Sequence, residues 1–495
     1  MDTLIELVYV VNKNIPRSFE NLLPKDSKIR QLFDAILKEK IKDDEEAAAF
    51  IYQTRSSDKK YLMLKNNLKK RLTEILLLSE HNEDEGSENI KNKFSFRKKL
   101  VITELLLMEN VFHNSEKILL KLRQEAENLQ LLDIEIECLK QLRTLYCLKG
   151  VPKENEKYDQ KLKKAINRAE YELKVQGMWE NIMSKRKYLL TYNTEIVEDA
   201  LKYYKEAGVY KKEVKSNTLF IYYLRIELAI YSYYQNHAQV TETLAELNKI
   251  LGHNQHLNNY LLSVELLAEE ATHYRNTADM SKALKTVHNA LEMSSYKAFT
   301  RFDIQNLHFD ILLKCNELEK ACQVLHEVKN CRQYPLLDPS DKAAWLIREA
   351  YLYFLLKTYQ LYPLIEKYTP YFTKKHALML FEDDCRPIQK DKTGYHLMFI
   401  VAGIIINIQK KEYDLEAEAN NLMVYYQRYI KDMVWEKTQY FLKSLSKIAK
   451  MHPSEYKKFD EKDKIIHTFE KKYNTIYDPC EIVPYLQIMN IILGE

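Results

Sequence analysis

Residues that break helices are scarce in this sequence. It has 8 glycines and 11 prolines in 495 residues, well below the roughly 12% that the two make up in an average protein. Pro152 is the only proline between Lys25 and Tyr334. Sheet proteins need frequent turns, and turns draw on Gly, Pro, Asn and Asp. The shortage therefore argues against a sheet protein and predicts an all-α chain.

The sequence also lacks the motifs that mark common enzymes and cofactor sites. It contains no GxGxxG and no GxxxxGK[ST] phosphate loop, no GxSxG, no HExxH and no CxxC. These absences argue against nucleotide, hydrolase and common zinc chemistry. We therefore expect no catalytic residue, no cofactor and no metal.

An excess of charge of one sign is missing as well. The 75 basic residues nearly balance the 71 acidic ones, so no strong field for nucleic acid or membrane follows. The 7 cysteines are odd in number and scattered, which fits a reducing compartment. Asp2 and Glu6 stand where a signal peptide has Lys or Arg. We expect a cytoplasmic protein.

Long apolar runs are also absent. The strongest, residues 397–406 (LMFIVAGIII), has 10 residues, about half of the roughly 20 that a membrane-spanning helix needs. We read it as a buried helix and expect no membrane contact.

What the sequence does contain is a helix-pair register that recurs along the chain. Each copy has apolar residues separated by three, nine, four and three positions, which is one buried stripe on a helix, a short turn and a buried stripe on a second helix. The clearest copies are Leu228, Tyr231, Val240, Leu244 and Leu247, then Ala271, Tyr274, Ala283, Val287 and Ala290, then Phe309, Leu312, Ala321, Leu325 and Val328. This spacing predicts stacked antiparallel helical hairpins.

The register extends imperfectly in both directions. A further good copy is Gly403, Ile406, Leu415, Ala419 and Leu422. Gly208 and Gly252 follow second helices, where C-cap glycines are expected. We expect three segments: an N-terminal helical region at 1–110, and two runs of helical repeats at 111–335 and 336–495.

At these positions the chain resembles the tetratricopeptide repeat (TPR), a family in which two helices cross closely at small residues. The set that matches the family's pattern best is Ala271, Tyr274, Ala283, Val287 and Ala290. The steps between copies, 43 and 38 residues, exceed the family's 34, and Leu228 and Phe309 replace a small residue. The resemblance implies an α-solenoid, a right-handed superhelix whose concave face binds peptides or proteins. It carries over no catalytic residue.

The expected function is a non-enzymatic scaffold that binds a protein or peptide partner. Stacked hairpins create an extended concave surface, and recognition residues would be exposed polar or aromatic ones on first helices. The candidates are Tyr222, Tyr223, Arg225 and Tyr234. A partly buried contact between repeats explains these four residues equally well.

Two other functions stay open. RNA binding would use the basic–aromatic strings at residues 94–99 (FSFRKK) and 184–188 (SKRKY), although solvated helix faces explain them too and no large basic patch is visible. An enzyme with an unrecognised site would need a pocket of converging ionisable groups with perturbed pKa values.

The best metal candidate is a set with helical spacing. Cys322 and His326 are four residues apart, with Cys315 and His308 at successive heptads before them. Small buried cysteines and a surface histidine are the alternative. His253 and His256 are three apart in a predicted loop, where no third ligand is near.

Overall fold

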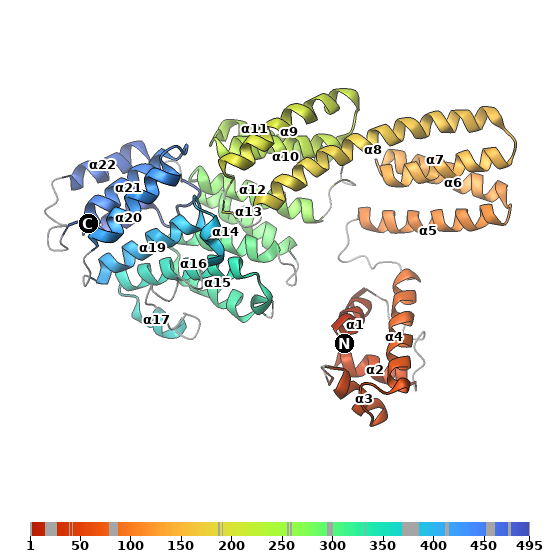
Figure 1. Ribbon diagram of the computed structural model, residues 1–495, viewed down its shortest axis with the longest axis horizontal. Coiled ribbons are helices and arrows are strands. Elements are labelled where there is room, and N and C mark those ends of the chain that lie inside the picture. Colours follow the sequence, from red (N-terminus) through yellow and green to blue (C-terminus); the bar gives the residue numbers. More distant parts are fainter. Residues whose placement is uncertain are drawn as a thin grey trace. The chain divides into compact units, whose positions relative to one another are not determined.

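The chain is all-helical. The computed structural model describes residues 2–14, 27–38, 40–41, 43–78, 88–186, 189–190, 192–254, 257, 260–294, 300–331, 333–368, 386–410, 415–451, 461–473 and 477–494. Within these ranges the regular structure consists of helices, without a strand (Figure 1), which confirms the prediction of an all-α chain. No helix in this part of the chain is long and apolar enough to cross a membrane.

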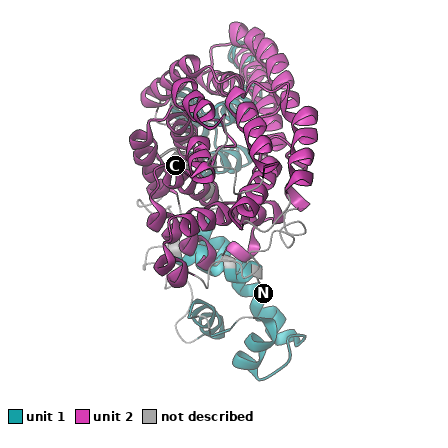
Figure 2. Ribbon diagram, turned by 90° about the vertical axis from the view of Figure 1, so that its left-hand side faces the viewer, with its two compact units in different colours: residues 1–158 teal, residues 159–495 magenta. Residues whose placement is uncertain are grey.

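Two compact units make up the chain, residues 1–158 (unit 1) and 159–495 (unit 2) (Figure 2). The boundary lies inside α8 (Pro152–Arg186), the longest helix of the described residues. The three segments divided at 110 and 335 stay a prediction.

The first core of unit 1 is built by α1 (Asp2–Asn14), α2 (Lys28–Leu37), α3 (Asp44–Tyr52) and α4 (Lys59–Leu78). Ser27 caps α2 by accepting the Arg30 N–H at 3.2 Å, and Asp43 caps α3 by accepting the Glu46 N–H at 2.9 Å. Both are N-cap residue types that offer a side-chain oxygen to a free backbone donor. The buried side chains include Leu4, Val8, Leu32, Ile36, Tyr61, Leu68 and Leu72.

The second part of unit 1 is a stack of three helices. These are α5 (Glu88–Met108), α6 (Phe112–Asn128) and α7 (Leu132–Leu148), each packed on the other two. Inside the stack the hydroxyl of Thr103 donates to Oε1 of Gln141 at 2.7 Å, which satisfies two buried polar groups at once.

Unit 2 continues with helices that pack on their neighbours in the sequence. The helices are α9 (Thr194–Glu213), α10 (Asn217–Tyr233), α11 (His237–His253), α12 (Tyr260–Asn276), α13 (Met280–Met293), α14 (Thr300–Lys314), α15 (Leu318–Asn330), α16 (Pro339–Thr358), α17 (Tyr362–Tyr368), α19 (Tyr395–Lys410), α20 (Glu416–Tyr425), α21 (Glu436–Ala449), α22 (Lys462–Lys472) and α23 (Tyr485–Leu493). In Figure 2 the helices of this unit stand around a central region.

The stripe residues of the register form the core, as predicted. In the three clearest copies all are buried except Tyr231 and Tyr274, which are partly buried. Ala271 of α12 and the two alanines of α13, Ala283 and Ala290, are fully buried. Their small side chains let the two helices approach closely.

One turn recurs between successive helices and, in the clear copies of the register, explains the fixed nine-residue step. A residue with positive φ follows the first helix, and the next N–H bonds back to the carbonyl five residues earlier, as in Asn236 to Tyr231 at 3.0 Å and Asp279 to Tyr274 at 2.9 Å. This pattern is the Schellman motif. The residues with positive φ in turns of this kind are Asn110, Gln130, Gly150, Gln235, Ala278, Asn316 and Gln360.

The expectation of C-cap glycines at Gly208 and Gly252 is wrong. Gly208 lies inside α9 and Gly252 inside α11. The residues that follow these two helices have negative φ, −134° at Val214 after α9 and −126° at Asn254 after α11, so neither end needs a glycine.

Two long-range links join distant parts of unit 2. The Leu190 N–H, after α8, donates to Oδ2 of Asp391, just before α19, at 3.0 Å. Residues 477–484, before α23, form a C-terminal loop that contacts the ends of α10, α12, α14 and α21. Gln235 donates to Asp478 at 2.9 Å, and Tyr477 donates to the Asn276 carbonyl at 3.0 Å.

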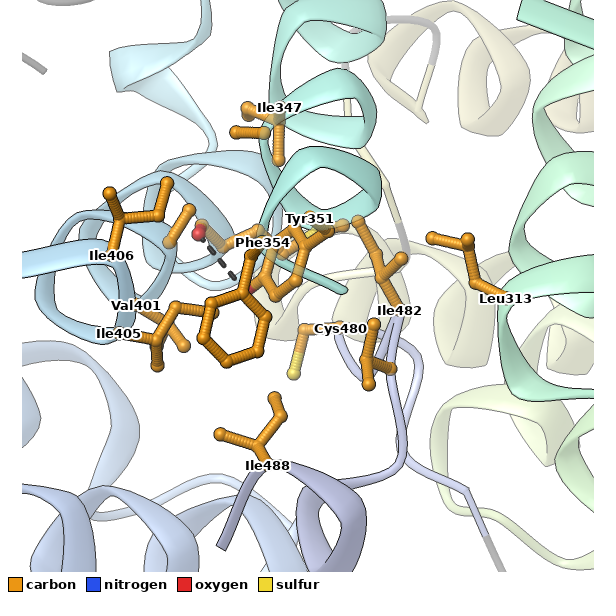
Figure 3. Close-up of a cluster of buried hydrophobic side chains, with 14 of the residues drawn as sticks. Leu313, Ile347, Tyr351, Phe354, Val401, Ile405, Ile406, Cys480, Ile482 and Ile488 are labelled. Atoms are coloured by element: carbon orange, nitrogen blue, oxygen red, sulfur yellow. Dashed lines mark hydrogen bonds between the residues drawn. The ribbon is translucent and has the colours of Figure 1, made fainter. Parts of the chain in front are cut away.

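The C-terminal loop also contributes to the largest core. Its apolar side chains lie among those of α16, α19 and α23 (Figure 3). The residues that meet there include Leu313, Tyr351, Phe354, Val401, Ile405, Cys480, Ile482 and Ile488. The loop is therefore an integral part of unit 2.

Candidate binding cavity

Unit 2 contains a cavity of about 530 Å³. Its walls come from α8, α10, α12, α14 and α16, together with Tyr395 of α19. Three of these helices, α10, α12 and α14, carry the first stripe of a clear copy of the register, so one wall is built by the same register position in three copies. The apolar lining includes Trp179, Met183, Leu190, Leu228, Val264, Ile304 and Leu307.

Arginine–carboxylate pairs join neighbouring helices across the cavity wall. Arg186 of α8 lies 2.6 Å from Oε1 of Glu269 in α12, and Arg225 of α10 pairs with Glu265 of α12. Arg225 also lies over the Trp179 ring, 4.3 Å from its centroid. Burial acts to lower the pKa of Arg186, but Tyr192 and Glu269 outweigh it and the pKa is raised. Arg186 and Arg225 are therefore each balanced by a glutamate of α12.

Asp310 of α14 pairs closely with one arginine and more distantly with a second. Arg348 of α16 donates to it through Nε at 2.8 Å and Nη2 at 2.9 Å, a bidentate pair that uses both carboxylate oxygens. Arg275 of α12 is held off, with Nη1 3.8 Å from Oδ2 of Asp310, and its Nε and Nη2 donate to the Asn276 amide oxygen at 3.1 and 2.9 Å. Burial lowers the pKa of Arg275, and the charge of Arg348 acts in the same direction, while Asp310 opposes the shift.

Asn306 of α14 brings an unpaired amide oxygen to the cavity. Its side chain is 8% exposed, it lines the cavity, and its Oδ1 is buried without a hydrogen-bond partner. A buried acceptor without a donor costs about 1–3 kcal/mol. Such a group is expected to bind something that enters the cavity.

A small recess of about 50 Å³ continues the cavity. The residues shared by both are Arg186, Leu190, Glu269, Thr272 and Arg275, and the recess adds Tyr192, Ser232, His237, Val240, His273, Asn276 and Pro479. His273 Nε2 is 3.0 Å from the Thr241 hydroxyl. His237 Nε2 is buried without a partner, and burial lowers the pKa of both imidazoles, that of His273 to about 4.

Of the four residues expected to contact a partner, the structure places Arg225 in the cavity. Tyr223 stacks on Tyr204 with ring centroids 4.7 Å apart, and Tyr222 is partly buried against the core around α8 and α9. Tyr234 is 49% exposed at the end of α10. The three tyrosines do not line the cavity, and partner binding by them stays a prediction.

The basic side chains of the two strings contact aromatic rings or carboxylates of the same chain. In residues 94–99, Lys98 and Lys99 lie over the rings of Phe94 and Phe96 at 4.7 and 5.4 Å, and Arg97 pairs with Asp133 at 3.2 Å. In residues 184–188, Lys185 and Arg186 both pair with carboxylates. Lys187 and Tyr188 lie outside the described residues.

The metal candidates are dispersed. Cys322 is buried in the core, His326 bonds to Asn330 at 2.8 Å, and His308 meets His288 with Nε2 atoms 3.2 Å apart. His253 Nδ1 lies 2.7 Å from the Lys249 carbonyl oxygen, whereas His256 lies outside the described residues. Over the part of the chain that the structure describes, no three His, Cys, Asp or Glu residues are placed to hold a metal.

Several cavity residues on α10, α12 and α14 share a register position, and of these sequence reasoning named Arg225 alone. Three residues before the first stripe residue of each clear copy stand Arg225, Ala268 and Asn306, and all three line the cavity. One helical turn earlier, Glu265 and Asp303 line it as well. Polar residues one and two turns before the stripe were thus the signal that could have identified this surface.

Comparisons with known proteins identify no relative. No protein-family model matches the chain, and no curated protein matches it in sequence. The cavity must therefore be interpreted from its own chemistry.

Proposed function

We propose that the chain is a non-enzymatic binding protein, a TPR-like right-handed α-solenoid whose unit 2 holds a short peptide segment of a partner in its cavity. The recurring Schellman turn and the packing of each helix on the next support the stacked-hairpin architecture. A cytoplasmic setting belongs to the same proposal, since the six cysteines among the described residues are all free.

The size of the cavity favours a short ligand. Its volume of about 530 Å³ falls within the roughly 300–1,000 Å³ typical of ligand pockets. The Leu190–Asp391 link and the C-terminal loop join distant parts of unit 2. The cavity is therefore smaller than the extended concave groove expected from the sequence, and its size favours a peptide segment of a few residues.

The observation that carries the proposal is the unpaired amide oxygen of Asn306, which lines the cavity. An asparagine amide offers both a donor and an acceptor, which is the complement of a peptide group. The apolar walls around it, including Leu228 and Ile304, can cover side chains of the bound segment. Apolar walls with a few fixed polar groups are the usual composition of a ligand site.

RNA binding has weaker support. The cavity arginines lie against carboxylates, among them Glu269 and Asp310, and a phosphate backbone would meet these negative charges at close range. A positively charged groove that follows the backbone is the expected footprint of single-stranded nucleic acid binding.

The proposal is tested by affinity selection with mass spectrometry. The full chain is incubated with a pool of tripeptides, half with free carboxyl termini and half amidated, and bound peptides are identified. We expect a restricted set to be retained. The variant Ala268→Trp, which fills the cavity beside the Asn306 position, should lose this set, whereas Ala238→Trp on the exposed side of α11 should keep it. Retention of no peptide, or of the same peptides by Ala268→Trp, would contradict the proposal.

A further inference from the structure

The recess at the end of the cavity presents two nitrogen groups without acceptors. Arg275 has its Nη1 beyond hydrogen-bond distance of Asp310, at 3.8 Å, and His237 has a buried Nε2 without a partner. The two residues come from different helices, α12 and α11, and line the same small space. With the imidazole proton on Nε2, both nitrogens are donors, and their convergence indicates that the recess is shaped for an acceptor.

The charges around the recess leave one cation only partly compensated. Arg186 is paired with Glu269 at 2.6 Å, and Arg348 occupies both oxygens of Asp310. Arg275 shares the single charge of Asp310 with Arg348, from 3.8 Å, and its hydrogen bonds go to the neutral Asn276 amide. A buried charge that is only partly balanced is costly, so a further group with a single negative charge would relieve the imbalance.

Size and shape narrow the choice of anion. The recess has about 50 Å³ of space, enough for a planar group with two oxygens. A guanidinium fork matches the two oxygens of a carboxylate. We infer that the recess binds a carboxylate group carried by the ligand of the cavity, an assignment that rests on the proposed function. Because the recess shares five lining residues with the cavity, one ligand can occupy both.

The protonation equilibria agree with this assignment. The titratable groups that line the recess are Arg186, Tyr192, His237, Glu269, His273 and Arg275. Burial lowers the pKa of His237 and of Arg275, which is the direction expected for buried groups whose charged forms are not fully balanced by an anion. A bound carboxylate favours the charged forms and should raise both pKa values.

A spectroscopic titration with small probes tests the recess directly. The full chain carries histidines labelled with carbon-13 at Cε1, and the His237→Asn variant identifies the His237 signal. Acetate should shift that signal saturably and raise the pKa of His237, whereas acetamide, of the same shape without the charge, should not. The signal of His253, on the exposed side of the same helix, is the internal control. Arg275→Gln should weaken acetate binding about tenfold or more, and Arg275→Lys should restore part of it.

Equal responses to acetate and acetamide, or a response to neither, would show that the recess holds only water and would overturn the inference. This comparison in the wild-type protein stands even if Arg275→Gln fails to fold.

The source of the carboxylate is distinguished by peptides. Each selected tripeptide is compared as the free acid, as the amide, and as an amide that carries Asp or Glu. Binding of the free acid alone assigns the recess to a chain terminus, and binding of the acidic amide assigns it to a side chain. If all forms bind equally, the inference fails while the proposed function stands. If none binds, the proposed function fails, and the acetate titration still decides whether the recess takes a carboxylate.

Discussion

Leu190 donates its backbone N–H to Asp391, 3.0 Å away, and so joins positions 201 residues apart in the sequence. Asp391 also accepts the N–H groups of Gly394 at 3.1 Å and Tyr395 at 2.8 Å. It therefore caps α19 and binds the segment after α8 at the same time. Since Tyr395 and Leu190 both line the cavity, this link holds two of its walls together.

Gly394 is required by this link because there is no room for a methyl group. A Cβ atom there would lie 2.2 Å from Oδ2 of Asp391 and 2.7 Å from Cβ of Leu190. We expect Gly394→Ala to destabilise unit 2 by about 1–3 kcal/mol through overpacking, measured as the free energy of unfolding in urea. The matched control is Gly177→Ala inside α8, where a Cβ meets nothing within 4 Å. That variant should be as stable as the wild type or more so. Equal losses would refute the close contact.

Glu481 of the C-terminal loop is the anion for two buried lysines. It pairs with Lys437 at 2.9 Å, and the Lys314 ammonium bonds to its backbone carbonyl. Burial lowers the pKa of Lys314 to about 7. Glu481→Gln should cost about 3–5 kcal/mol, as expected when a buried pair loses one partner.

The control for this prediction is Glu436→Gln, which removes an equally short but exposed pair with Lys472 at 2.8 Å. An exposed pair contributes little, so this variant should unfold at nearly the same urea concentration as the wild type. A Glu481→Gln protein as stable as Glu436→Gln would contradict the burial of the lysine cluster.

The turn residue Ala278 adopts φ of +60°, a region that costs a residue with a Cβ about 1–2 kcal/mol. Ala278→Gly removes this cost, but glycine also adds entropy to the unfolded chain, which opposes the gain. The free energy of unfolding should therefore rise by up to about 1 kcal/mol. Ala271→Gly, in the buried interior of α12, should lower it. Calorimetry of both variants checks the sign, and a destabilised Ala278→Gly protein would refute the left-handed turn.

Three histidines of unit 2 make its stability depend on pH. Burial lowers the pKa values of His273, His308 and His396 to about 4, whereas in the unfolded chain they titrate near 6.5. Between these values the unfolded state binds more protons, so stability is fully present above about pH 6.5 and falls as the pH drops towards 4. Urea unfolding at pH 7 and pH 5 should show the loss. His308→Gln should reduce the difference, and His253→Gln should not.

The sequence predicted the parts of the fold that depend on local spacing. The stripes beginning at Leu228, Ala271 and Phe309 proved to be core because a helix repeats every 3.6 residues. The same spacing implied the short turn, although not that Gln235 and Ala278 would adopt positive φ in place of glycine.

The cavity could be foreseen only in part, because it depends on pairings between distant residues. Nothing local to Leu190 or Asp391 indicates that they meet, and the contact of Gln235 with Asp478 spans 243 positions. Arg225 was identified as a candidate from its exposed register position, but whether an arginine is paired depends on a carboxylate in another helix. For that reason Arg275 and Asn306 were missed.

The central claim is that the cavity of unit 2 binds a short peptide segment. The most direct measurement is isothermal titration calorimetry of the wild-type chain and Ala268→Trp with a tripeptide retained in the selection experiment. We predict saturable binding of about one peptide per chain to the wild type and a loss of affinity of about tenfold or more in the variant. Equal affinity of the two proteins would place the peptide outside the cavity and contradict the claim.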